Sequence, residues 1–139
     1  MKMSGRAINP GEAEGEAIVS KEPVGFYGNI DMKTGVIIEK GHPLEGVCIS
    51  GKVFVFPHGK GSTVGSYVIY GLKKNGVAPL AIINKETETI VATGVILADI
   101  PCLDGIDIEK ITTGDTVKVK IGEKDGFVEI KSARKEGII

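Results

Sequence analysis

Cysteine, histidine and aromatic residues are scarce in this sequence. Its 139 residues include two cysteines, two histidines and no tryptophan, and aromatic residues make up 5% of the chain. Two isolated cysteines are too few for a disulfide framework and lack the CxxC spacing of metal sites. We therefore expect Cys48 and Cys102 to be buried thiols and expect no metal site in this chain. The shortage of aromatic side chains also argues against a stacking platform for single-stranded nucleic acid.

An excess of one charge and a long apolar run are absent as well. Seventeen basic and 18 acidic residues leave a formal net charge of -1, so no overall field attracts nucleic acid or anionic lipid. The amino end lacks the apolar core of a signal peptide, and no apolar run approaches the roughly 20 residues that span a membrane. We expect a cytoplasmic protein that binds neither nucleic acid nor membranes.

Glycine, in contrast, is abundant, and its 20 residues separate short apolar segments. Short strands between glycine-containing turns, with helical periodicity only in the middle of the chain, are typical of a β-rich α/β domain. The length fits a single domain with a real core. We expect that domain to cover residues 1–131 and residues 132–139 to form a flexible tail.

Periodicity and turn residues predict the order of the elements. Val64, Val68 and Leu72 recur every four residues before Asn75-Gly76, which predicts a helix of about three turns starting at Ser62. A second helix is expected over residues 86–100, weakened by a glycine at position 94. The other predicted elements are a hairpin turning at Pro10-Gly11, strands at 36–39, 53–56, 79–84 and 100–105, and a terminal hairpin joining 117–121 to 127–130.

The segment PHGKGSTVGSY, residues 57–67, lies between a predicted buried strand and the first predicted helix. A strand-to-helix turn directs unpaired backbone N–H groups at a bound anion, because the first turn of a helix has donors without an internal partner. Backbone donors and the nearby Lys60 would both favour an ionised Ser62. On the residues alone, Ser62 is either a helix-capping hydroxyl or a reactive oxygen.

Two other chemistries are disfavoured by the spacing of these residues. GKGST is not a nucleotide-binding P-loop, because that motif needs four residues between its first glycine and Gly-Lys-Ser/Thr. His42 and His58 lie in separate loops without the i, i+4 spacing of a zinc helix, so we expect both to be solvated.

Three longer segments resemble the small subunit of the aconitase X family: FYGNIDMKTGVII, GHPLEGVCISGKVFVFPHGKGSTVGSYVIYGL and APLAIINKETETIVATGVILADIP. The most specific signature is GKGS at a strand-to-helix junction, with DxxTG before it and AIIN…E after it. The resemblance covers most of the chain. It implies a swivelling β/β/α fold like the mobile domain of aconitase, and a two-subunit hydro-lyase that is active only with its large subunit.

The resemblance also implies a reaction and roles for particular residues. Ser62 would be the proton acceptor in the dehydration of (R)-5-phosphomevalonate to trans-anhydromevalonate 5-phosphate, a step of the archaeal mevalonate pathway to isoprenoids. Gly59, Lys60, Gly61 and Thr63 would bind the substrate or support the alkoxide. Thr63 stands where relatives often have a second serine, and it keeps the hydroxyl. An iron-sulfur cluster of the 4Fe-4S type would belong to the large subunit, since two scattered cysteines cannot hold it.

Three alternatives remain open. The first is the small subunit of a cis-3-hydroxy-L-proline dehydratase, which would keep Ser62 and change the substrate. The second is a swivelling phosphohistidine carrier, which the opening PGEAEGEA and closing TTGDTVKV resemble, with His58 carrying the phosphate; the TSH motif of such domains is missing. The third is a binding domain without catalytic activity, in which Ser62 would only cap the helix.

Overall fold

The computed structural model describes residues 1–132 of the chain. The predicted tail, residues 132–139, lies outside the described residues except for Ser132. The elements in chain order are β1 (Lys2–Asn9), β2 (Gly11–Val19), β3 (Val24–Gly25), β4 (Val53–Phe56), β5 (Gly59–Lys60), α1 (Gly65–Lys74), β6 (Ala81–Asn84), α2 (Thr89–Ala98), β7 (Cys102–Asp104), the 3-10 helix η1 (Ile108–Lys110), β8 (Thr116–Ile121) and β9 (Asp125–Lys131).

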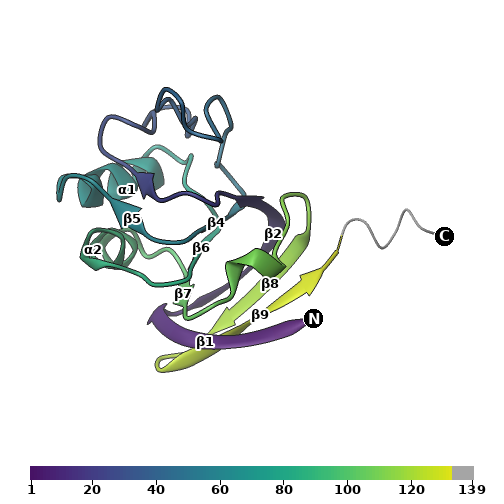
Figure 1. Cartoon of the computed structure of the whole chain (residues 1–139). Coiled ribbons are helices and arrows are strands. Elements are labelled where there is room, and N and C mark those ends of the chain that lie inside the picture. The colour runs from purple at the N-terminus through teal and green to yellow at the C-terminus, as the bar shows by residue number, and fades with distance from the viewer. Residues whose placement is uncertain (133–139) are drawn as a thin grey trace.

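Seven of the strands form a closed barrel in the order β1-β7-β6-β4-β2-β8-β9 (Figure 1). Neighbours β2, β4, β6 and β7 run parallel, whereas β1, β8 and β9 pair antiparallel with their neighbours. The two α-helices lie together on the parallel side of the barrel (Figure 1). A separate pair, β3 and β5, lies next to them.

Two apolar clusters fill the interior of residues 1–132, and the parallel strands contribute to both. Phe54 and Phe56 of β4 pack with the helices, while Val53 and Val55 of the same strand face the barrel interior. All four residues are fully buried, which explains why this strand reads as a continuous apolar run. The parallel strands are therefore covered on both faces.

The two helices approach each other closely at Gly94. A Cβ atom on Gly94 would lie 2.5 Å from Ile69 Cδ1 and 2.9 Å from Ile69 Cβ. The glycine that weakens the predicted second helix is thus the point at which α2 packs against α1. None of the helices in residues 1–132 is long and apolar enough to cross a membrane.

Two predicted elements are wrong. The segments around Pro10 form β1 and β2, but these strands do not pair with each other as a hairpin: β1 pairs with β7 and β9, and β2 with β4 and β8. The chain turns a corner of the barrel there, which local turn signals cannot distinguish from a hairpin. Residues 36–39 contribute isolated bridges, Ile30 to Ile37 and Val36 to Cys48, instead of a strand. The terminal hairpin and both helices are confirmed.

One cysteine and one histidine also differ from expectation. Cys48 is exposed, and its thiol donates a hydrogen bond to the Thr34 carbonyl at 3.4 Å. His42 is buried, because its ring holds two loop segments together: Nδ1 accepts from the Leu44 N–H at 3.0 Å, and Nε2 lies 3.3 Å from the Pro23 carbonyl. Cys102 is buried as predicted, and burial raises the pKa of its thiol to about 12. His58 is exposed, as expected.

Candidate functional site

The GKGS loop leaves the sheet at the carboxyl end of β4, the side on which ligands of parallel sheets bind. Directly after Pro57 and His58, the chain forms the short strand β5, which pairs in parallel with β3. The Val24 N–H donates a hydrogen bond to the His58 carbonyl at 3.2 Å. The Lys85 and Glu86 N–H groups both donate to the Pro57 carbonyl at 3.1 Å. The loop is therefore attached on one side to β3 and on the other to the segment after β6.

Gly59 is the point at which this loop contacts α2. A Cβ atom on Gly59 would lie 2.3 Å from Glu88 Oε1 and 2.7 Å from Val91 Cγ2, so no larger residue fits without displacing them. Glu88 itself caps α2, since its carboxylate accepts from the Ile90 N–H at 2.8 Å and the Val91 N–H at 2.9 Å. Glu88 was not identified from the sequence as a residue supporting the site.

Gly61 and Ser62 form the turn that leads into α1. Gly61 has a φ of 91°, in the region that favours glycine. Ser62 is exposed, and its hydroxyl accepts a hydrogen bond from the Val64 N–H at 3.2 Å. The N-cap of α1 is Val64, which makes no side-chain cap, so Ser62 supports the turn before the helix and is not the N-cap residue. Its side chain makes no other hydrogen bond within residues 1–132.

The backbone around Ser62 offers free donors. The carbonyls of Ser62 and Thr63 accept from the Gly65 and Ser66 N–H groups at 2.9 Å and 3.2 Å. The N–H groups of Ser62 and Thr63 themselves donate to no acceptor in the part of the chain that the structure describes. These two unpaired donors lie in the turn before α1, since the helix begins after the N-cap Val64. Unpaired backbone donors in a turn can bind an anion or stabilise an oxyanion. The arrangement is suited to a negatively charged ligand or to a serine that loses its proton.

Lys60 is held by a residue that the sequence did not indicate. Its Nζ atom lies 3.1 Å from Glu39 Oε2, an ion pair between β5 and the long segment that precedes β4. The ammonium group is therefore balanced by a carboxylate. No local pattern could have indicated a partner 21 residues away.

A buried polar network fixes the segment between β6 and α2. Asn84 Nδ2 donates to the Phe56 carbonyl at 2.9 Å, and the Thr87 hydroxyl donates to Asn84 Oδ1 at 2.8 Å. The Asp104 carboxylate accepts from the Thr87 N–H at 2.8 Å and from the Arg6 guanidinium at 3.0 and 2.8 Å. Burial of Asp104 opposes ionisation, but these hydrogen bonds and the Arg6 charge hold the pKa of this carboxyl below its usual value. This network holds Thr87, the residue directly before Glu88, in place.

Three hollows are relevant to the location of a site. A groove of about 270 Å³ runs along α2 from Thr89 to Leu97 beside the start of α1, and Thr63 and Val64 line one side of it. A cleft of about 490 Å³ at the carboxyl ends of the parallel strands contains Pro57, Lys21 and Lys85 together with Asp107 and Glu109. Neither is lined by a residue of GKGS itself, but the cleft includes Pro57 and the groove includes Thr63, which lie on either side of that segment in the chain.

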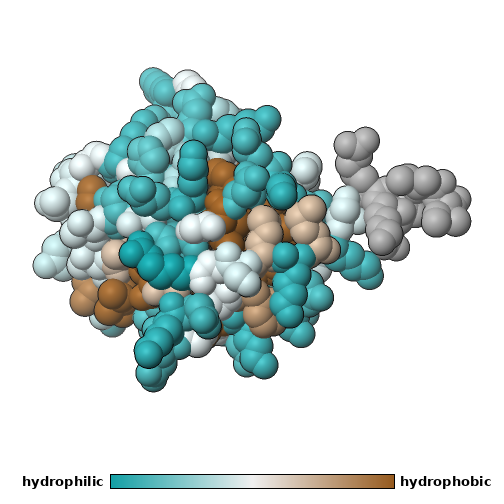
Figure 2. Space-filling model, turned by 60° about the horizontal axis from the view of Figure 1, so that its bottom comes forward, coloured by the Kyte–Doolittle hydropathy of each residue, from teal (hydrophilic) through white to brown (hydrophobic). Residues whose placement is uncertain are grey.

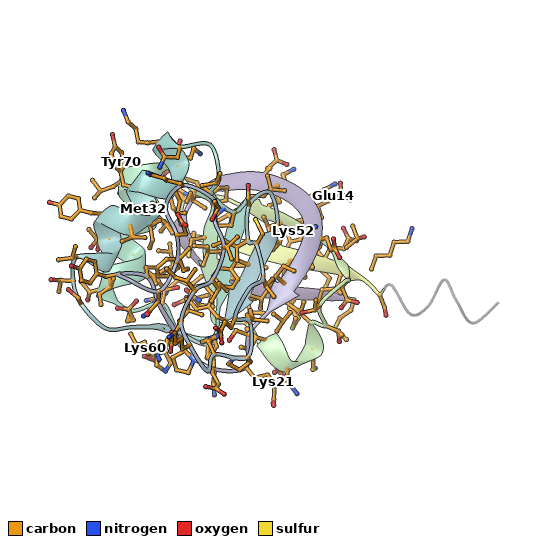
Figure 3. All side chains as sticks on the ribbon, turned by 90° about the horizontal axis from the view of Figure 1, so that it is seen from above. Glu14, Lys21, Met32, Lys52, Lys60 and Tyr70 are labelled. Carbon is orange, nitrogen blue, oxygen red and sulfur yellow. The ribbon has the colours of Figure 1, made fainter. Side chains whose placement is uncertain are left out.

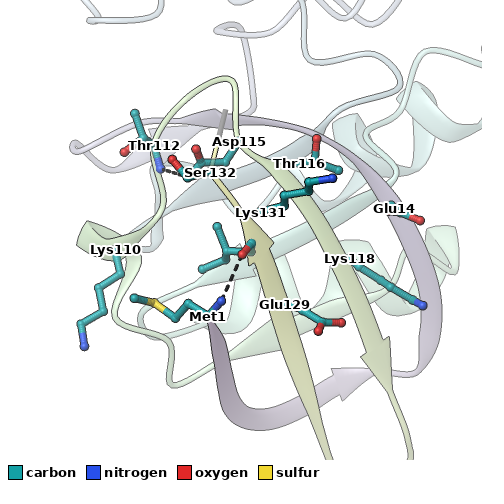
Figure 4. A pocket seen from close by; sticks show the side chains of 11 residues that line it. Met1, Glu14, Lys110, Thr112, Asp115, Thr116, Lys118, Glu129, Lys131 and Ser132 are labelled. Carbon is teal, nitrogen blue, oxygen red and sulfur yellow. Dashed lines mark hydrogen bonds between the residues drawn. The ribbon is translucent and has the colours of Figure 1, made fainter. Parts of the chain in front are cut away.

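The third hollow, of about 680 Å³, lies on the antiparallel side (Figure 4). Figure 4 shows its walls formed by Lys118 of β8 and Glu129 of β9, with the Met1 amino group donating to the Ile130 carbonyl. Its lining includes none of residues 59–63. Within residues 1–132, no group of three or more His, Cys, Asp or Glu side chains is placed to hold a metal ion.

Comparison with known proteins identifies the family. Residues 2–130 match the model of the aconitase X swivel domain. The chain belongs to the aconitase X swivel-domain family. A solved structure of Thermococcus kodakaraensis aconitase X in its holo-form resembles it with a TM-score of 0.91 and 53% identity, covering 95% of this chain and 99% of that one. The expected β-rich swivelling β/β/α fold is thereby confirmed.

Two curated relatives share a common name. A phosphomevalonate dehydratase small subunit of Thermococcus onnurineus is 56% identical over 131 residues, covering 94% of this chain and 99% of the relative. Its counterpart in Methanosarcina acetivorans is 53% identical over 133 residues, covering 94% and 91%. Both names describe subunits of an enzyme, so these relatives act together with a larger chain.

Proposed function

We propose that this chain is the small subunit of a phosphomevalonate dehydratase, a hydro-lyase that converts (R)-5-phosphomevalonate to trans-anhydromevalonate 5-phosphate. The observation that carries the proposal is the exposed Ser62 hydroxyl beside two unpaired N–H groups in the turn before α1, in a family whose relatives bear this name. A soluble heterodimer in the cytoplasm is the proposed form.

Ser62 is the proposed proton acceptor. Removing a proton from the carbon next to a carboxylate requires a strong base, and an alkoxide meets that need better than a carboxylate does. The N–H groups of Ser62 and Thr63 and the start of α1 would stabilise the alkoxide charge. The hydrogen bond that the Ser62 hydroxyl accepts from the Val64 N–H would favour one orientation of this oxygen before substrate binds.

The neighbouring residues have distinct proposed roles. Gly59 lets the loop lie against the capping carboxylate of Glu88, and Gly61 provides the left-handed turn that presents Ser62. Thr63 contributes an N–H group. Lys60, which is paired with Glu39, would support the loop through that ion pair and add one positive charge near the substrate. Its contribution to the charge at Ser62 is thus smaller than an unpaired lysine would give.

The iron-sulfur cluster that the family implies does not fit this chain. Cys48 is exposed and Cys102 is buried, and no group of three candidate ligands occurs within residues 1–132. We propose that the large subunit holds the cluster. This chain would then contribute the base and part of the substrate-binding surface.

The test is a reconstituted two-subunit assay. The chain is co-expressed with its cognate large subunit, the complex is purified and reconstituted without oxygen, and dehydration of 5-phosphomevalonate and of cis-3-hydroxy-L-proline is followed. We expect turnover of the phosphorylated substrate, and we expect Ser62→Ala to assemble normally without turnover. Turnover of the proline compound alone would replace the proposed substrate, and an active Ser62→Ala complex would reject Ser62 as the base.

A further inference from the structure

An apolar surface covers the outer side of the two helices. It is formed by Val64, Tyr67 and Tyr70 at the start and on the face of α1, and by Ile96 and Leu97 on α2; we call these five residues the helical face. Tyr67 is 69% exposed, Ile96 58% and Leu97 52%. Figure 2 shows hydrophobic surface on the side of the molecule where the helices lie, and Figure 3 shows Tyr70 projecting outward from α1.

The composition of α2 is unusual for an exposed helix. Its sequence, TIVATGVILA, contains no charged residue, although only Val91, Gly94, Val95 and Ala98 are buried. A surface helix of a monomer normally carries charged residues on its outer side, whereas a helix that is apolar all round is covered. The exposed side of α2 carries Thr89 and Thr93 in its first half and Ile96 and Leu97 in its second, without a charge, so the second half has the composition of a covered surface.

The helical face is continuous with the candidate site. The groove of about 270 Å³ between the helices is lined by Val64, Tyr67, Ile90 and Leu97 and reaches Thr63, the residue after Ser62. On the other side of the loop, the cleft contains two lysines and two carboxylates, a polar surface suited to small charged molecules. A protein partner that meets the site is therefore expected on the side of the helices.

Dehydration itself requires a partner close to Ser62. The proton and the hydroxyl leave from adjacent carbons, so the base and the group that assists hydroxyl departure lie within a few ångströms of the same substrate. No titratable side chain in residues 1–132 hydrogen-bonds to Ser62. In the proposed two-subunit enzyme that group comes from the large subunit, and the groove that reaches Thr63 offers the large subunit an apolar surface next to Ser62.

We propose that the helical face is the docking surface for the large subunit, with one large apolar side chain of the partner filling the groove between α1 and α2. This inference rests on the proposed two-subunit enzyme but concerns assembly and not the reaction. Apolar and aromatic residues at the centre of an interface contribute most of its binding energy. Tyr67 and Leu97, on opposite walls of the groove, are the expected centre.

The experiment compares two substitutions in the helical face with a matched substitution elsewhere. Leu97→Lys and Tyr67→Lys each place a charge in the groove, whereas Leu80→Lys changes another exposed leucine, 39% exposed, directly before the amino end of β6. Thermal unfolding of the isolated chains verifies folding, and titration with the large subunit measures Kd. We expect Kd to rise at least about tenfold for the two groove variants and to stay unchanged for Leu80→Lys.

Hydrogen exchange of the unmodified chain provides a second measurement that requires no variant. Adding the large subunit should slow amide exchange in residues 64–74 and 89–98 more than in β8 and β9. Unchanged Kd values for both groove variants, or no added protection of the helices, would overturn the proposal. The chain alone could instead form a concentration-dependent dimer. If Leu97→Lys abolished that dimer and left the Kd for the large subunit unchanged, the helical face would be the contact between two copies of this chain.

The outcomes separate this inference from the proposed function. A complex that assembles, loses affinity through Leu97→Lys and dehydrates neither substrate would retain the docking surface and reject the reaction. A complex that turns over phosphomevalonate and tolerates both groove variants would retain the reaction and reject the docking surface.

Discussion

The antiparallel and parallel strands of the barrel differ in their exposure and in their role. Strand β8 alternates exposed and buried residues, with its lysines directed to solvent, and β9 follows a similar pattern. Strands β4, β6 and β7 are buried throughout, because the helices cover the outer face and the barrel interior lies on the other. The candidate site lies at the carboxyl ends of the buried strands, next to the helices.

The antiparallel strands therefore form the structural part of the barrel, whereas the parallel strands position the candidate site. The antiparallel strands pair with their neighbours over long registers. Exposed and buried residues alternate along them because one face of each strand is open to solvent. Strands β4, β6 and β7 are short, and each leads into a loop at the same end, where Pro57, Lys85 and Gly105 meet. Substitutions in these loops should affect activity, whereas substitutions on the solvent-exposed face of the antiparallel strands should not.

The largest expected difference concerns two exposed serines. Ser62→Ala should reduce turnover of the reconstituted complex by about 1,000-fold or more, because the complex loses its proposed base. Ser4→Ala, in β1 on the antiparallel side, removes an equally small hydroxyl and should leave turnover unchanged. Steady-state kinetics of the two variants provide the comparison. Equal activities would mean that the loop is not the catalytic part of the molecule.

A second pair of substitutions tests the packing of the helices. Alanine favours a helix over glycine by about 1 kcal/mol in an open position. Gly94→Ala should nevertheless lower the free energy of unfolding by about 1–3 kcal/mol, because the new methyl group would contact the branched part of Ile69.

Gly71→Ala is the matched control for that substitution. Its methyl group would meet the Sδ atom of the half-exposed Met32, the flexible end of a side chain that can move away. We expect it to be neutral or to stabilise the chain by up to about 1 kcal/mol. Urea unfolding of both variants measures the difference, and a stabilising Gly94→Ala would contradict the close helix contact.

The ion pair of Arg6 with Asp104 joins the two kinds of strand, since Arg6 lies in β1 and Asp104 in β7. Asp104→Asn should lower the free energy of unfolding at pH 7 by about 1–2 kcal/mol. Because the pKa of Asp104 is lowered in the folded protein, its stabilisation is present above the ordinary value of 3.8 and is lost as the pH falls through the lowered pKa. Unfolding curves measured at pH 7 and below pH 4 should therefore show a smaller difference in free energy of unfolding between wild type and variant at the lower pH. A difference that does not change with pH would exclude the ionised carboxylate as its source.

The smallest effect concerns the two thiols. In the folded chain, a neutral thiol reagent should label Cys48 alone, because Cys102 is buried in β7 and the pKa of its thiol is raised to about 12. Cys48→Ser should change the free energy of unfolding by less than about 0.5 kcal/mol, as expected for an exposed position. Mass spectrometry of the labelled chain before and after unfolding counts the reactive thiols, and rapid labelling of both in the native state would contradict the buried position of Cys102.

Much of the fold followed from the sequence where local signals and tertiary environment agree. The alternation of Val117, Val119 and Ile121 predicted the terminal hairpin, and the spacing of Val68 and Leu72 predicted α1. The errors have one physical origin. Pro10 marks a corner of a barrel, and the Cys48 and His42 environments depend on segments brought together by the fold.

By itself, the sequence determined the β-rich α/β class, the two helices and the location of a candidate site in GKGS, because periodicity, turn residues and motif spacing are local properties. Only the tertiary structure decided that Glu88 supports Gly59, that Glu39 balances Lys60, and that Gly94 is a helix contact. It also decided that Val64, Tyr67 and Leu97 share one exposed surface. These relations join residues far apart in the chain, so they arise only when strands pair and helices pack.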